Sequence, residues 1–94
     1  MSYVARSTMV AARMLGDEMV IMSGKDSTLF TLNPVATVIW NAADGRTTLE
    51  EIVEQKVCQE FEVERATAMQ DAESFVSELS EHGILLVSES PIVT

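Results

Sequence analysis

The sequence predicts an α+β domain in which a three-stranded antiparallel meander is followed by three helices. Two observations support this prediction: short apolar runs separated by turn residues fill the first third of the chain, and apolar residues at helical spacing fill most of the rest. A last apolar run, residues 84–87, is either a small extra strand or a tail folded over the core. With 94 residues, of which 47% are hydrophobic, residues 1–94 are expected to form a single domain.

The expected strands are residues 9–15, 18–23 and 28–32. Gly16-Asp17 is a two-residue pair suited to a tight hairpin between the first two strands, and residues 23–26 supply a second turn. In such a meander the first and third strands are both edge strands. One side of each therefore has backbone N–H and C=O groups that are free to pair with another chain.

Three helices are expected after the meander, and each has its own start or stop signal. Asn33-Pro34 starts the first helix, because Asn accepts from a free N–H group and Pro has no N–H to leave unpaired. Asp44-Gly45 ends it, since glycine tolerates a left-handed conformation. A threonine at position 47 or 48 caps the second helix, and the third helix begins within residues 63–66 and runs to His82-Gly83.

The composition argues against catalysis, metal binding and nucleic-acid binding. His82 is the single histidine and Cys58 the single cysteine, so a Cys/His nucleophile would need both, and together they cannot form a four-ligand zinc site. Six Lys and Arg residues against fifteen Asp and Glu leave few cations for phosphates. We therefore expect no enzyme activity, no catalytic or metal-binding residue, no cofactor and no nucleic-acid partner.

The sequence also argues against secretion and membrane insertion. One cysteine excludes an intramolecular disulfide, and Arg6 and Arg13 interrupt the apolar stretch near the N-terminus. The longest uncharged run, residues 27–43, contains several polar residues and changes its period midway, which does not fit a membrane span. We expect a cytoplasmic protein without a membrane partner.

Several short strings occur in the order and spacing of a known family. They are Phe30-Thr-Leu32-Asn33, Ile39-Trp40, Asp44-Gly45-Arg46-Thr47, Glu51-Ile52-Val53, Asp71 followed by Phe75, and Leu79 with Gly83-Ile84-Leu85. On these strings the chain resembles the PqqD family, the peptide-binding chaperones of pyrroloquinoline quinone (PQQ) biosynthesis and their relatives. The resemblance extends from Gly16 to Leu86. The Leu-Asn pair before the first helix and the Asp-Gly pair after it are its most distinctive parts.

The resemblance implies a winged-helix-like fold that recognises ribosomally synthesised precursor peptides without catalysis. In that family the leader segment of the peptide adds as a strand to the edge of the third strand and packs against the third helix. A modifying enzyme, often a radical SAM protein, acts on the core segment of the peptide. Carried over by position, the implied peptide-binding residues are Thr28, Leu29, Phe30, Thr31 and Leu32 on the strand, and Arg65, Ala68, Met69, Ala72, Phe75 and Val76 on the helix.

The residue pattern is compatible with that role, but it leaves alternatives open. An exposed edge strand beside a wide apolar helix face is what strand addition needs, although a small domain also needs such a face to close its own core. The alternatives are a winged-helix DNA-binding or transcription-associated protein, which the acidic third helix disfavours, and a module that forms a homodimer through the same strand edge.

Two further points stay open at this level. Phe75 is either a groove residue or an ordinary core residue. Thr28 and Thr31 are three residues apart, so their backbone groups face opposite edges of the strand, but the sequence does not say which of them faces outward.

Overall fold

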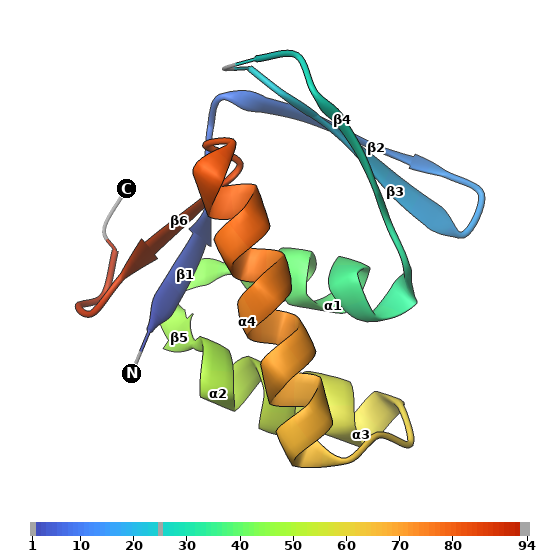
Figure 1. Cartoon of the computed structure of the whole chain (residues 1–94), viewed down its shortest axis with the longest axis vertical. Coiled ribbons are helices and arrows are strands. Elements are labelled where there is room, and N and C mark those ends of the chain that lie inside the picture. The colour runs from blue at the N-terminus through green and yellow to red at the C-terminus, as the bar shows by residue number, and fades with distance from the viewer. Residues whose placement is uncertain (1, 25, 93–94) are drawn as a thin grey trace.

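The computed structural model describes residues 2–24 and 26–92, so Lys25, within the expected second turn, lies outside the described residues. Two antiparallel three-stranded sheets pack with the helices in the α+β fold that the sequence predicts (Figure 1). The elements in chain order are β1 (Tyr3–Arg6), β2 (Val10–Leu15), β3 (Glu18–Ser23), β4 (Leu29–Leu32), α1 (Pro34–Ala42), β5 (Asp44–Thr48), α2 (Leu49–Ile52), the π-helical turn η1 (Val53–Val57), α3 (Cys58–Glu60), α4 (Arg65–Glu81) and β6 (Leu85–Ser88).

The first sheet is the predicted meander, in the order β2-β3-β4. Leu15 pairs with Glu18 across the two-residue turn, where Gly16 has a φ of 66°. This positive φ is the conformation that a tight hairpin turn requires and that glycine adopts without strain. Among the described strands β2 and β4 each have one paired neighbour, so both are edge strands.

The second sheet, in the order β5-β1-β6, was not predicted. β1 is its central strand and pairs antiparallel with both neighbours, which lie far along the chain. The run that was expected to be a strand or a tail is β6. The Asp44-Gly45 pair ends α1, as expected, but it also begins β5, with Gly45 at a φ of 81°.

Local signals place the ends of the helices. The Asn33 side chain accepts from Ala36 N at 2.8 Å, with Pro34 at the first helical position, as predicted. The second helix is a continuous run of α2, η1 and α3, in which the turn Val53–Val57 is π-helical. Thr48 caps it in a capping box: Thr48 Oγ1 accepts from Glu51 N at 3.2 Å, and Glu51 Oε1 accepts from Thr48 N at 3.3 Å.

Replacing Thr48 with alanine is expected to lower the free energy of unfolding by about 1 kcal/mol, because the first turn of α2 loses its side-chain acceptor. Urea denaturation followed by circular dichroism would measure the change. Thr48→Ser keeps the hydroxyl and serves as the control. Equal losses in the two variants would contradict a role for the capping hydroxyl.

The core lies between the two sheets and the helices. α4 contributes Ala68, Ala72, Val76 and Leu79, which are all buried. The largest fully buried apolar side chains come from six segments of the fold: Ile21, Ile39, Ile52, Leu79, Ile84 and Leu85. Trp40 is also buried and belongs to this core. Within the described residues, none of the helices has the length and apolar character needed to cross a membrane.

Candidate functional site

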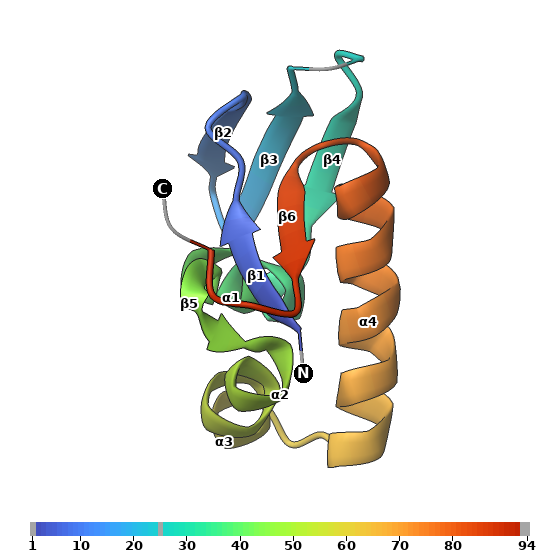
Figure 2. The ribbon, with the colours of Figure 1, turned by 90° about the vertical axis from the view of Figure 1, so that its left-hand side faces the viewer.

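The free edge of β4 faces α4. Figure 2 shows β4 as the strand of its sheet nearest that helix. Ser23 N donates to Thr28 O at 3.0 Å, so the Thr28 carbonyl points to β3. Backbone groups alternate in direction along a strand, so the N–H and C=O of Leu29 and Thr31 point away from β3. Both residues are exposed, and the edge beside α4 is therefore open to an added strand.

A cavity of about 260 Å³ begins directly after β4, between α1 and α4. Most of its wall is apolar, and Val57 of η1 and Val63 of the following loop contribute to it. The described residues that line it are Asn33, Val35, Ala36, Ile39, Val57, Val63, Thr67, Ala68, Asp71, Ala72 and Phe75. The open edge of β4 adjoins this cavity, because Asn33, which lines the cavity, directly follows Leu32 at the end of β4. We call the edge and the cavity together the β4–α4 groove.

Only some of the six helix residues that the resemblance implies line the cavity. Ala68, Ala72 and Phe75 line the cavity, and Phe75 is half-buried rather than a fully buried core residue. Arg65 instead pairs with a residue of η1, with 2.6 Å between Arg65 Nε and Glu54 Oε1.

The last two of the six residues also lie outside the cavity lining. Val76 is buried and lines a separate hollow beside Leu49 of α2 and Val87 of β6. Met69 is half-buried against the core. Of the five strand residues, Phe30 and Leu32 pack with the core, whereas Leu29 and Thr31 are exposed.

Sequence reasoning missed most of the cavity lining. Thr67 and Asp71 lie on the same flank of α4 as Phe75, at successive intervals of four residues. This spacing places the three residues together, but the sequence contains no signal that this flank faces α1. The α1 residues Ala36 and Ile39 were not among the predicted peptide-binding residues.

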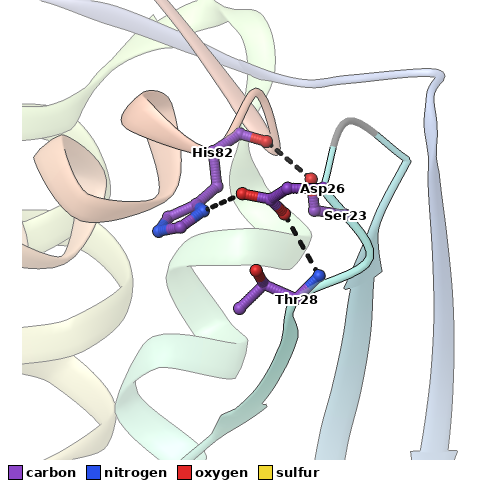
Figure 3. A network of polar contacts seen from close by, with 4 residues as sticks. All are labelled: Ser23, Asp26, Thr28 and His82. Atoms are coloured by element: carbon purple, nitrogen blue, oxygen red, sulfur yellow. Dashed lines mark hydrogen bonds and ion pairs between the residues drawn. The ribbon is translucent and has the colours of Figure 1, made fainter.

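A polar network holds the other end of β4 against the end of α4 (Figure 3). His82 Nδ1 lies 2.6 Å from Asp26 Oδ2, and Ser23 Oγ donates to His82 O at 2.7 Å. Asp26 Oδ1 accepts from Thr28 N at 3.1 Å. The Phe30 ring meets the His82 ring edge-on, with 4.9 Å between the centroids. These contacts join the β3–β4 turn to α4 and so fix the distance across the groove at this end.

The hydrogen bonds from His82 and then Thr28 hold the pKa of the Asp26 carboxyl well below its usual range. A lowered pKa in the folded state means that the unfolded chain binds the proton more readily. The stabilisation is therefore present above about pH 4 and is lost as the pH falls further.

Asp26→Asn should lower the melting temperature at pH 6, and the difference from the wild type should shrink toward pH 3. Melting curves over this range would test it, with Asp17→Asn at the exposed hairpin turn as the control. A difference that stays constant with pH would contradict the expectation.

Among the described residues, no group of three or more His, Cys, Asp or Glu side chains is placed to hold a metal ion. Cys58 is half-buried, as expected for an ordinary helix residue.

Comparisons with known proteins agree with this architecture. The family model described as Coenzyme PQQ synthesis protein D (PqqD) matches residues 18–85, which include β3, β4 and all of α4. A solved structure of TbiB1 in complex with the TbiA(beta) leader peptide is similar, with a TM-score of 0.74 and 30% sequence identity. The match covers 86% of this chain and 93% of that chain. No curated protein matches the chain.

Proposed function

This chain belongs to the PqqD family, and from that premise we propose that it is a non-catalytic adaptor that binds the leader segment of a ribosomally synthesised precursor peptide. The observation that carries the proposal is the open edge of β4 beside the apolar cavity. Strand addition uses both parts: backbone hydrogen bonds set the register, and pockets for alternate side chains determine which peptide sequences bind. The similarity to TbiB1, which was solved with a leader peptide, supports this proposal.

In the proposed complex, the leader backbone pairs with Leu29 and Thr31. Its inward side chains lie beside Phe30 and pack on Ala72 and Phe75. Of the other predicted residues, Thr28 and Leu32 hold β4 in its sheet, and Ala68 extends the cavity wall. Arg65, Met69 and Val76 lie outside the cavity lining, and we assign them to the support of α4.

The bound leader would present the rest of the precursor peptide to a modifying enzyme. A radical SAM enzyme is the partner that we propose, in PQQ synthesis or in the synthesis of another peptide product. Binding without catalysis is sufficient for this role, because an adaptor raises the effective concentration of the peptide at the enzyme. A second copy of this chain is the competing occupant of the same edge.

Capture from a lysate of the source organism would test the proposal. Immobilised protein should retain a short peptide together with a peptide-modifying enzyme, and mass spectrometry would identify both. Gel filtration over a concentration series would report self-association through the edge. Recovery of nucleic acid alone, or of this chain alone, would contradict the proposed function.

Phe75→Ala is expected to weaken leader binding by about tenfold or more, because the ring forms part of the cavity wall. Since Phe75 is only half-buried, the loss of folding free energy should stay below the about 3–5 kcal/mol typical of a fully buried Phe. Thermal melts and titrations with the captured peptide would measure the two effects.

Val76→Ala is the matched control for this test. Val76 is the next residue of α4, but it is buried and lines a different hollow, so its truncation should lower stability without a specific loss of affinity. If Phe75→Ala unfolded the domain, Phe75 would be a structural residue rather than part of the binding site.

A further inference from the structure

We infer that Asp71 makes the β4–α4 groove selective for leaders that carry a lysine or arginine at an inward-facing position. This inference rests on the proposed peptide binding and deepens it. Asp71 is the one ionisable side chain among the described residues that line the cavity. Any selectivity of the cavity for charge therefore depends on this carboxylate.

The shape of the groove fits a long basic side chain. Thr67, Asp71 and Phe75 follow one another at one-turn intervals along the flank of α4, so Asp71 lies midway along this wall. The buried apolar side chains of Ile39 and Ala72 line the same cavity. Lysine and arginine place their aliphatic stems on apolar surface and keep the charged end in water. A stem over Ile39 and Ala72 would bring the cationic end to the exposed Asp71.

Asp71 has no cationic partner of its own within the described residues. The ion pairs there are Arg65 with Glu54 and His82 with Asp26, so the one arginine of α4 is engaged on another side of the helix. The formal charge of −9 attracts basic peptides in general, but exposed charges are screened beyond about 8–10 Å at physiological salt. A preference for a basic residue at one peptide position therefore requires a local carboxylate.

Strand geometry predicts the sequence pattern. Side chains alternate between the two faces of a strand, so every second residue of an added strand faces α4. The basic residue should therefore stand two residues from an apolar residue that faces the same way. Because an exposed ion pair contributes little, Asp71→Asn should weaken binding of such a peptide only about threefold to fivefold.

Selection from a library tests the inference without knowledge of the natural leader. A phage-displayed library of random 12-residue peptides would be selected on immobilised wild type, Asp71→Asn, Asp71→Lys and Glu73→Lys. Glu73→Lys makes the same change in net charge as Asp71→Lys, but Glu73 lines the separate hollow that also contains Val76. Both aspartate variants should fold, because Asp71 is exposed, and melting curves would check this.

The expected result is a basic residue at one position of the consensus for wild type and Glu73→Lys, an acidic residue there for Asp71→Lys, and no charge preference for Asp71→Asn. The same consensus on wild type and Asp71→Lys would overturn the inference and leave the proposed function standing. A purely apolar consensus on wild type would also overturn the inference and leave the proposed function standing. Failure to enrich any peptide on any variant would overturn the proposed function and the inference with it.

Discussion

Replacing Thr31 with proline is expected to weaken leader binding strongly while the domain stays folded. The N–H of Thr31 points to the open edge of β4 and has no partner in the sheet, so its removal costs the fold no ladder hydrogen bond. An added strand loses that donor and meets the proline ring at the same place. A backbone carbonyl of the leader is then left without a donor, and the proline ring obstructs the added strand. Together these two effects should weaken binding by about tenfold to a hundredfold. Titration with the captured peptide, followed by NMR, would measure this, and melting curves would confirm the fold.

Thr28→Pro is the control for this test. Thr28 N donates to Asp26 Oδ1, and Thr28 O accepts from Ser23 N, so proline at this position disturbs the β3–β4 turn and should lower the melting temperature. Thr31→Ser keeps the N–H and should bind the leader as the wild type does. A folded Thr31→Pro variant with normal affinity would show that the edge of β4 is not the recognition surface.

Ile21→Ala is expected to have the largest effect on stability. Ile21 is fully buried on β3, the central strand of its sheet, and it stands opposite Phe30 of β4. The truncation removes apolar burial and leaves a cavity, which costs about 2–5 kcal/mol. Small domains are stable by only about 5–15 kcal/mol, so a large part of the stability is lost. Urea denaturation would give the change in the free energy of unfolding.

Val20→Ala tests whether this effect depends on the face of the sheet. Val20 is the preceding residue, points to the opposite face and is only half-buried. Its truncation should therefore cost clearly less than that of Ile21. Similar losses at both positions would contradict the assignment of the inner and outer faces of β3.

The sequence by itself determined the elements that depend on nearby residues. The Gly16-Asp17 hairpin, the Asn33-Pro34 helix start and the helix cap in the Thr47-Thr48 pair were all predicted, and the structure contains each of them. Each signal acts over about four residues, within which a turn or a cap closes its own hydrogen bonds. The free edge of the third strand follows from the order of the meander, which short turns impose.

Tertiary structure alone decided the second sheet. β1 is a four-residue strand that is defined by its pairing with β5 and β6, both distant in sequence. Short strands carry little pattern of their own, because sheet stability comes from cross-strand neighbours. The π-helical turn Val53–Val57 was likewise not predicted from the local sequence.

The candidate site divides in the same way. The apolar face of the last helix is visible in its periodicity, but the sequence does not show which flank of that face lies beside β4. In the folded chain, Asp71 and Phe75 line the cavity, whereas Arg65 forms an ion pair with Glu54 of η1. The sequence also does not determine whether the backbone groups of Thr28 or of Thr31 face the open edge, because a strand has two equivalent edges until a neighbour pairs with one of them. The hydrogen bond from Ser23 N to Thr28 O makes that choice.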